Sequence, residues 1–170
     1  DFYCDEVFTP RGVISTREYL EHPGAVAILA FPQPEKIILV QQYRYPIKKT
    51  IYEIPAGKLD RGEPPLLCAR RELEEETGYR AKKIQKIYSF YPSPAFCTEI
   101  LHIYLATELI PTQTNHDPDE TLNTFIVSYQ QALDWTLQGK INDAKSVIAF
   151  WFYELHGSSP FRRSPGKDGS

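Results

Sequence analysis

The sequence predicts an α/β protein in which helices cover both faces of a mixed sheet. Short apolar runs that suit buried strands come before and after one helical stretch near the middle of the chain, and two further helical stretches follow late. Strands and helices in this order pack as layers around a shared core. A length of 170 residues suits one domain with a sizeable core.

The first strands are expected on either side of a turn. Residues 25–31 and 36–42 are apolar runs separated by Pro32-Gln33-Pro34, and they predict two buried strands joined by a tight turn. A third strand is expected over residues 50–54, where apolar and polar residues alternate until Pro55-Ala56-Gly57 interrupts them.

The central helix is predicted over residues 64–77. Two prolines occupy its first turn, where their missing N–H groups do no harm, and Gly78 supplies a stop at the other end. Two further strands are expected over residues 84–91 and 99–108, linked by a loop that contains two prolines.

The C-terminal third predicts a strand over residues 124–127 and then two helices. Ser128 and Gln131 form a capping-box pattern that opens the first of these helices. The second, over residues 143–155, is apolar nearly all round, and we therefore expect it to be buried.

Three regions are expected along the chain. Residues 1–21 form an N-terminal segment that suits a small antiparallel sheet, and residues 22–156 form the main domain. Residues 157–170 are basic and rich in Pro, Gly and Ser, which predicts a disordered tail.

The composition narrows the class of partner. A formal net charge of -3 offers no general basic surface, so we expect no nucleic-acid partner. No apolar run reaches the roughly 20 residues of a membrane helix and no secretory signal is visible, so we expect no membrane association. Cys4, Cys68 and Cys97 are spaced too irregularly for a disulfide framework or a zinc cluster, which indicates a reducing cytoplasm.

The end of the central helix is crowded with acidic residues. Glu72, Glu75 and Glu76 share one helix face because they lie three and four positions apart, whereas Glu74 turns away. Carboxylates at a helix C-terminus oppose the helix dipole. Two interpretations follow from the residues alone, a solvated acidic face or a site for a hard divalent cation that prefers oxygen ligands. No EF-hand pattern is present, which excludes a calcium loop of that kind.

The residues around this acidic end follow a fixed spacing. From Gly57 the order is five residues, Glu63, seven residues, Arg71-Glu72-Leu73, one residue, Glu75-Glu76, one residue, Gly78, Tyr79. This resembles the signature of the Nudix hydrolase family, with Tyr79 in place of the usual aliphatic residue. A match at so many positions is far more specific than a short glycine motif.

The resemblance implies the Nudix fold, an α/β/α sandwich around a mixed sheet, and hydrolysis of a nucleoside diphosphate linked to another moiety. It implies that Glu72, Glu75 and Glu76 bind catalytic Mg²⁺ or Mn²⁺ and that Glu75 and Arg71 are catalytic, Arg71 by orienting a glutamate through an ion pair. The carbonyl of Ala56 would complete the coordination sphere, although a turn residue alone also explains its position.

A second set of residues resembles the ADP-ribose pyrophosphatase subfamily. Pro94 lies sixteen residues after Gly78, in a segment similar to a pattern in which SPGF precedes a glutamate, with Ala95 replacing the glycine. Further matches bring the resemblance to residues 8–155; they are Arg17, His22-Pro23-Gly24-Ala25-Val26, Gln42-Tyr43-Arg44, Glu53-Ile54-Pro55-Ala56-Gly57-Lys58 and Asn142-Asp143-Ala144-Lys145.

By this resemblance the substrate would be held by residues from several parts of the chain. Arg17 and Arg44 would contact phosphate or ribose, and Glu99 would accept hydrogen bonds from ribose hydroxyls; the complete set is Arg17, Arg44, Glu53, Pro94 and Glu99. An arginine suits phosphate because its guanidinium pairs bidentately with oxygens. From the residues alone, Arg44 could be a surface arginine, and Glu53 and Glu99 could be ordinary strand residues. Phe2 or Tyr3 could stack on a base or serve packing alone.

The catalytic base is expected in the acidic loop at residues 116–120. In relatives that act on ADP-ribose it lies on the loop before the final strand, which points to Glu120, with Asp119 as the reserve. A carboxylate can orient or deprotonate a metal-bound water. A solvated acidic loop is the alternative.

The preferred hypothesis is metal-dependent hydrolysis of the pyrophosphate bond of ADP-ribose to AMP and ribose 5-phosphate. One alternative is a Nudix hydrolase of another nucleoside-diphosphate sugar or a dinucleotide. Another is a non-catalytic module that binds a nucleotide, which fits poorly because such modules lose metal-binding glutamates that this chain retains. The resemblance also implies a homodimer that exchanges the N-terminal sheet.

Overall fold

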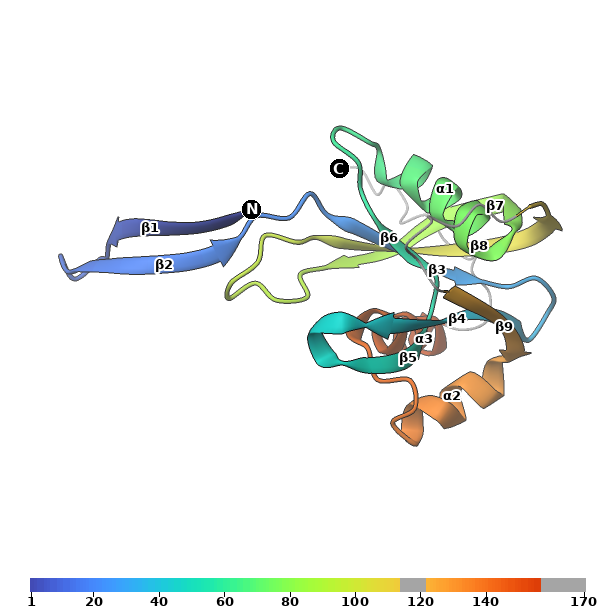
Figure 1. The fold of residues 1–170 in the computed structure, drawn as a ribbon. Coiled ribbons are helices and arrows are strands. Elements are labelled where there is room, and N and C mark those ends of the chain that lie inside the picture. The colour runs from blue at the N-terminus through green and yellow to red at the C-terminus, as the bar shows by residue number, and fades with distance from the viewer. Residues whose placement is uncertain (114–121, 157–170) are drawn as a thin grey trace, which may run out of the picture.

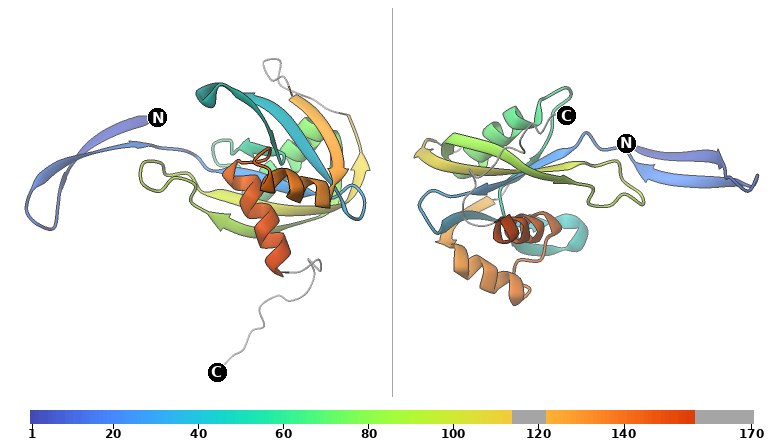
Figure 2. Two further views of the ribbon diagram at one scale, coloured as in Figure 1. Left: turned by 90° about the horizontal axis from the view of Figure 1, so that it is seen from below. Right: turned by 180° about the vertical axis from the view of Figure 1, so that it is seen from behind.

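The computed structural model describes residues 1–113 and 122–156 (Figure 1). The chain begins with an antiparallel pair, β1 (Phe2–Phe8) and β2 (Ile14–Leu20), which forms a sheet of its own. This pair projects from the rest of the described structure as an arm, visible from each side (Figures 1 and 2). The expected small N-terminal sheet is therefore present.

The body contains a mixed four-stranded sheet in the order β6-β3-β8-β7. Its strands are β3 (Ala25–Ala30), β6 (Ala56–Lys58), β7 (Tyr79–Phe90) and β8 (Leu101–Pro111). Strands β3 and β8 run parallel, whereas β6 and β7 run antiparallel to their neighbours.

A second, antiparallel sheet has the order β5-β4-β9. It is built from β4 (Lys36–Arg44), β5 (Lys49–Glu53) and β9 (Leu122–Ser128), with a short 3₁₀ turn, Tyr45–Ile47, between β4 and β5.

Strand β3 is buried on both faces, and its alternate residues enter two different cores. Val26 and Ile28 pack with the helix α1 (Pro65–Thr77), which contributes Cys68, Ala69 and Leu73. The alternate residues Ala25, Ala27 and Leu29 pack with the helices α2 (Tyr129–Leu137) and α3 (Ala144–His156) on the other side (Figure 1). The prediction of a mixed sheet between helical layers is confirmed.

The helix ends follow the local sequence signals. Pro64 is the N-cap of α1, and Gly78 ends the helix at a φ of 68°, which favours glycine. The side chain of Ser128 accepts a hydrogen bond of 3.1 Å from the amide of Gln131 and caps α2, as the capping-box pattern predicts.

The partners of β3 and β4 differ from what a tight turn between them suggests. The two strands lie in different sheets, because β3 pairs with β6 and β8 whereas β4 pairs with β5 and β9. Strand β6 itself was not expected, since Pro55 interrupts the alternation just before it. Strand β7 begins at Tyr79 rather than near residue 84.

The expectation of a fully buried final helix is wrong. Ala149 and Phe150 are buried, but Trp151 is 58% and Leu155 is 78% exposed. Helix α3 covers the sheet with one face only, so its apolar residues on the other face meet solvent. In the described part of the chain, each helix is too short or too polar to cross a membrane.

Candidate active site

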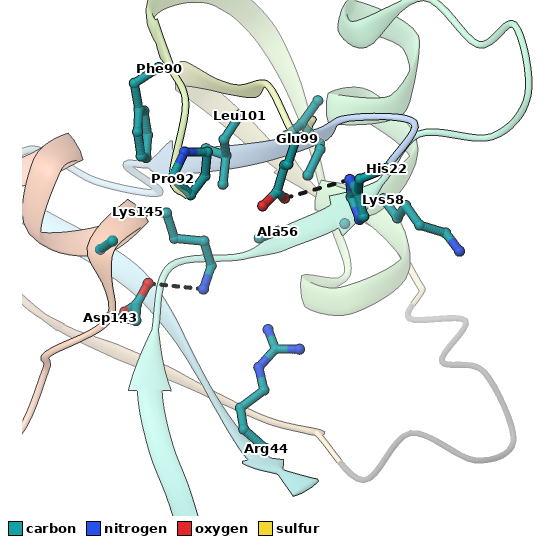
Figure 3. A pocket seen from close by; sticks show the side chains of 14 residues that line it. His22, Arg44, Ala56, Lys58, Phe90, Pro92, Glu99, Leu101, Asp143 and Lys145 are labelled. Atoms are coloured by element: carbon teal, nitrogen blue, oxygen red, sulfur yellow. Dashed lines mark hydrogen bonds and ion pairs between the residues drawn. The ribbon is translucent and has the colours of Figure 1, made fainter. Parts of the chain in front are cut away.

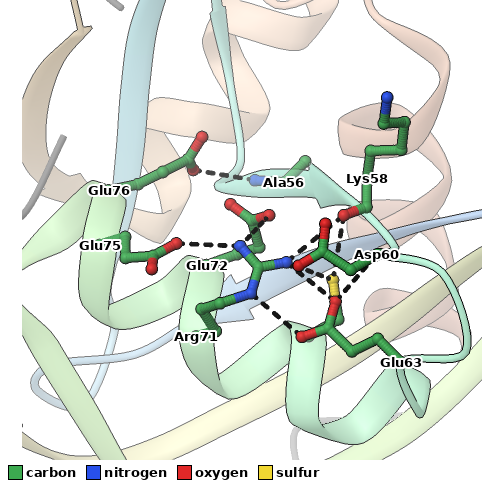
Figure 4. A network of polar contacts seen from close by, with 9 residues as sticks. Ala56, Lys58, Asp60, Glu63, Arg71, Glu72, Glu75 and Glu76 are labelled. Carbon is green, nitrogen blue, oxygen red and sulfur yellow. Dashed lines mark hydrogen bonds and ion pairs between the residues drawn. The ribbon is translucent and has the colours of Figure 1, made fainter. Parts of the chain in front are cut away.

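Arg71 lies at the centre of the acidic cluster on α1 (Figure 4). Its Nε and Nη2 donate hydrogen bonds of 3.0 and 2.9 Å to the two carboxylate oxygens of Glu63. Its Nη1 donates to Glu72 at 2.8 Å and to Glu75 at 2.9 Å. One guanidinium therefore orients three glutamates, as the planar fork of its donors allows.

The ion pair with Arg71 changes the acidity of Glu63. The hydrogen bonds from Arg71 lower the pKa of Glu63 to about 2, with a smaller contribution from the amide of Asp60. The same carboxylates raise the pKa of Arg71 above its ordinary value. Glu63 thus stays ionised and fixes the loop before α1 to the helix.

Gly57 lies directly against the carboxylate of Glu72. A Cβ atom at this position would fall 1.8 Å from the carboxyl carbon of Glu72 and 1.9 Å from its Oε1. Any larger residue would displace the carboxylate. Glycine at residue 57 is therefore a condition for the present position of Glu72.

Ala56 connects the same loop to the last turn of the helix. Its amide donates a hydrogen bond of 3.0 Å to Oε2 of Glu76, whose residue is only 5% exposed. The hydroxyl of Thr124 on β9 donates to the carbonyl of Glu76 at 3.1 Å. Glu76 is therefore held between the loop and the second sheet.

The donor set at this end of α1 fits a hard divalent cation in kind. Glu72, Glu75 and Glu76 supply carboxylate oxygens, which Mg²⁺ and Mn²⁺ prefer, and Gly57 allows the Glu72 carboxylate to lie against the loop. In the arrangement described, the guanidinium of Arg71 supplies the counter-charge to Glu72 and Glu75. Within residues 1–113 and 122–156, no three acidic, His or Cys side chains converge as a ready metal-binding group.

A pocket of about 330 Å³ adjoins this cluster. Ala56 and Gly57 line its wall and also contact Glu76 and Glu72, so they form the boundary between pocket and acidic helix. Other lining residues come from several elements (Figure 3); they are His22, Ala25, Val26, Arg44, Lys58, Phe90, Pro92, Glu99, Leu101, Asp143, Ala144 and Lys145.

Arg44 enters the pocket from the end of β4. Its Nε and Nη2 donate to the two oxygens of Glu53 at 2.8 and 2.9 Å, and Lys145 from α3 also pairs with Glu53. Burial by itself would raise the pKa of Glu53, but the hydrogen bonds from Arg44 and the charge of Lys145 outweigh it and leave this pKa below its ordinary value. Glu53 is therefore a buried carboxylate paired on both oxygens.

His22 and Glu99 form another wall of the pocket (Figure 3). Nδ1 of His22 accepts the amide hydrogen of Gly24 at 3.2 Å and lies 3.8 Å from Oε1 of Glu99. The imidazole and the carboxylate therefore face each other across this wall of the pocket.

The expected substrate residues are only partly gathered around the pocket. Arg44 and Glu99 line it, and Glu53 lies behind Arg44. Pro94 is exposed and does not line the pocket, where Pro92 takes the place expected for it. Arg17 lies on the arm, where its guanidinium donates to Ser15 and to the carbonyl of Thr16. Glu120 lies outside the described residues, as does Asp119.

Several lining residues were not expected as site residues. His22, Asp143 and Lys145 were visible only as members of stretches that match the subfamily, and Phe90 gave no signal. A lysine on the first turn of a late helix gives no local sign that it will meet a glutamate at the end of an earlier strand.

Comparison with known proteins is consistent with this geometry. Residues 21–151 match the family model described as NUDIX domain. An ADP-ribose pyrophosphatase of Bacillus subtilis (strain 168) is 46% identical over 157 residues, which cover 91% of this chain and 85% of that protein. A methanol dehydrogenase activator of Bacillus methanolicus is 43% identical over 153 residues, covering 89% and 83%.

A solved structure supports the fold. The crystal structure of an ADP compounds hydrolase superposes with a TM-score of 0.79, over 90% of this chain and 83% of that chain, at 22% identity. At this identity the likeness concerns the fold alone.

Proposed function

This chain belongs to the Nudix hydrolase family, and on that premise we propose that it hydrolyses the pyrophosphate bond of ADP-ribose to AMP and ribose 5-phosphate. The observation that carries the proposal is the shared wall of Ala56 and Gly57. These two residues line the pocket and contact the acidic cluster, so a pyrophosphate in the pocket lies beside the carboxylates.

The protein's own groups have separate tasks in this reaction. Arg44 and Lys58 line the pocket and supply positive charge for the phosphate oxygens. Glu72, Glu75 and Glu76, with the carbonyl of Ala56, would hold Mg²⁺ or Mn²⁺. Such a cation offsets charge on the phosphoryl oxygens and lowers the pKa of a water molecule.

Arg71 and Gly57 keep these carboxylates in place. Arg71 orients Glu72 and Glu75 through its Nη1, and Gly57 leaves the space that Glu72 fills. Because the cluster is oriented before the substrate arrives, little reorganisation is required during the reaction.

Glu120 is proposed as the base that accepts a proton from the attacking water. The support is its place in the acidic loop before β9, together with the suitability of a carboxylate once a cation has lowered the pKa of water.

A homodimer is proposed from the arm. Its exposed apolar side chains include Phe2, 87% exposed, and Phe8, 78% exposed, together with Val13 and Ile14. An arm of this kind suits a second copy of the chain, and Arg17 would then reach the pocket of the partner subunit. Light scattering tests the mass of the intact chain, and a monomer at all concentrations would contradict the proposal.

A cytoplasmic location is proposed as well. Cys4, Cys68 and Cys97 are all free thiols. Free thiols without a disulfide framework suit a reducing compartment.

A second candidate is a module that acts on another enzyme. The 43% identical relative named methanol dehydrogenase activator supports this candidate, and such a role does not exclude hydrolysis. The complete set of carboxylates around Arg71 favours a catalytic role for this chain.

A hydrolysis panel with Mg²⁺ tests the proposed substrate. ADP-ribose, GDP-mannose, NADH, a diadenosine polyphosphate and 8-oxo-dGTP would be compared at equal concentration, and we expect ADP-ribose to give the highest kcat/KM. Fast hydrolysis of another compound with ADP-ribose untouched would contradict the proposal. If the chain hydrolyses none of the five compounds, the second candidate is favoured.

A further inference from the structure

Glu53 is a buried carboxylate that lies between two cations from different elements. Its residue is 1% exposed at the end of β5. Arg44 at the end of β4 donates to both of its oxygens, and Lys145 in the first turn of α3 pairs with Oε2. A buried charge is costly unless it is paired and hydrogen-bonded, and here the pairing is complete.

The contact with Glu53 uses one edge of the Arg44 guanidinium. Nε and Nη2 face the carboxylate, whereas Nη1 forms no hydrogen bond with residues 1–113 or 122–156. Arg44 lines the pocket, so its remaining donors are available to a ligand there (Figure 3). Glu53 therefore fixes the direction in which Arg44 presents these donors.

Glu53 and a bound phosphate would compete for the same guanidinium. With Arg44 as its only partner, the buried carboxylate would hold the guanidinium more firmly and offset its positive charge. Lys145 supplies a second cation, so that Glu53 remains paired when Arg44 also binds an anionic ligand.

Lys145 is held in position by its own helix. Its Nζ donates to Oδ1 of Asp143 at 2.9 Å, and the same oxygen accepts the amide hydrogen of Ser146 at 3.1 Å. The hydroxyl of Ser146 accepts the amide hydrogen of Ile54 at 2.9 Å, which fixes this turn to the residue after Glu53. The ammonium group is thus directed at Glu53 by Asp143 within the same turn and by the hydrogen bond between Ser146 and Ile54, which joins α3 to the end of β5.

We propose that Lys145 is a positioning residue for Arg44, acting through Glu53, and that it thereby sets the affinity of the pocket for the pyrophosphate of the substrate. The proposal rests on the proposed function for the identity of the substrate, but not for the contacts themselves. Under this proposal Glu53, which the subfamily resemblance places among the substrate-binding residues, supports Arg44 and does not itself contact the substrate.

Binding of inorganic pyrophosphate, measured by calorimetry without substrate turnover, tests the proposal. Lys145→Met keeps the length of the side chain and removes its charge, and we expect Kd to rise about ten-fold, in the range of a charged hydrogen bond. Lys145→Arg should recover most of the affinity. Lys82→Met removes a charge from an exposed position on β7 and serves as the control, with Kd unchanged.

A double variant separates positioning from direct contact. If Lys145 acts through Arg44, the variant with both Arg44→Met and Lys145→Met binds pyrophosphate as weakly as Arg44→Met alone. Independent effects that multiply in the double variant would mean that Lys145 contacts the ligand itself, and they would overturn the proposal. An unchanged Kd in Lys145→Met, or no pyrophosphate binding by the wild-type chain, would also overturn it.

If Lys145→Met alone does not fold, a second substitution at Glu53 allows the same test. Lys145→Met together with Glu53→Gln removes both buried charges, so no unpaired carboxylate remains. This variant should fold, and because the proposed role of Lys145 depends on the charge of Glu53, Lys145→Met should weaken binding much less in the Glu53→Gln background than in the wild-type chain. The same ten-fold weakening in that background would overturn the proposal.

Kinetics distinguish this proposal from the proposed function. In Lys145→Met, KM for ADP-ribose should rise about ten-fold while kcat changes less than about three-fold, as expected for lost ground-state binding. A wild-type chain that binds pyrophosphate but leaves ADP-ribose intact would contradict the proposed function, while the calorimetry still decides the role of Lys145.

Discussion

The amide of Ala56 donates a hydrogen bond of 3.0 Å to the carboxylate of Glu76. This contact joins the wall of the pocket to the acidic end of α1. Glu53 pairs with Arg44 and Lys145, Ile54 bonds to Ser146, and Pro55 bonds to Ile28. Ala56 bonds to Glu76, and Gly57 lies against Glu72. Five consecutive residues therefore connect the cationic side of the pocket with the carboxylates.

Glu76→Gln should lower kcat for ADP-ribose by at least about a hundred-fold, because it removes a charged oxygen ligand from the proposed cation site. The amide side chain can still accept the hydrogen bond from Ala56, so the melting temperature should change little. Steady-state kinetics and thermal unfolding check both parts. Wild-type rates in this variant would contradict the cation site.

Gly57→Ala should reduce activity strongly and stability slightly. The new Cβ would take the space of the Glu72 carboxylate, which is the end of a flexible side chain and can move away. Gly62→Ala is the comparison, because its Cβ meets open space, although its φ of 78° adds strain of about 1 kcal/mol. Equal activity in the two variants would show that the position of Glu72 is unimportant.

Arg71→Lys should destabilise the protein by about 2 kcal/mol, because a single ammonium cannot pair with three carboxylates as the guanidinium does. Chemical denaturation measures the loss of unfolding free energy. Arg80→Lys removes the two-point contact with Glu74 at an exposed position and should cost far less. Equal losses in both variants would contradict the central place of Arg71.

The contribution of Glu63 should depend on pH in a defined direction. Its pKa is about 2 in the folded protein, against an ordinary value of 4.5, so the folded state favours the ionised form. The stability difference between the wild-type chain and Glu63→Gln should be complete above about pH 5 and should shrink as the pH falls toward 2. A difference that grows on acidification would contradict the ion pair with Arg71.

Mg²⁺ should stabilise the wild-type chain against unfolding. A cation at ten times its Kd adds about 1.4 kcal/mol if it binds only the folded state. Thermal unfolding with and without Mg²⁺ measures this gain, and Glu76→Gln should lose most of it. An equal gain in both chains would place the cation elsewhere.

Glu120→Gln tests the catalytic base, with an expected fall in kcat of about 10²- to 10⁴-fold and little change in KM. Asp119→Asn is the matched control. If only the control loses activity, the base is Asp119.

Features of the fold that depend on neighbouring residues could be predicted from the sequence. The two prolines and Gly78 determine where α1 begins and ends, and Ser128 caps α2. The shared face of Glu72, Glu75 and Glu76 follows from helical spacing. Partners distant in the chain could not be predicted, because apolar runs such as β3 and β4 do not specify which strands they join.

The candidate site shows the same division. The cluster around Arg71 lies within one motif and was expected, whereas the contact of Lys145 with Glu53 joins residues that are 92 positions apart. Arg17 matches the subfamily pattern but lies on β2 of the arm, since a sequence match gives the type of residue and not its place in the fold. Pro92 rather than Pro94 lines the pocket, a difference set by the path of the loop.

The central place of β3 also has a consequence for biosynthesis. This strand is buried on both faces, yet its parallel partner β8 begins only at Leu101. A nascent chain on the ribosome therefore carries a fully apolar strand that lacks its parallel partner until most of the domain has been translated. Such a segment is a binding site for chaperones and a risk for aggregation, so the yield of folded protein should depend on the speed of translation between β3 and β8.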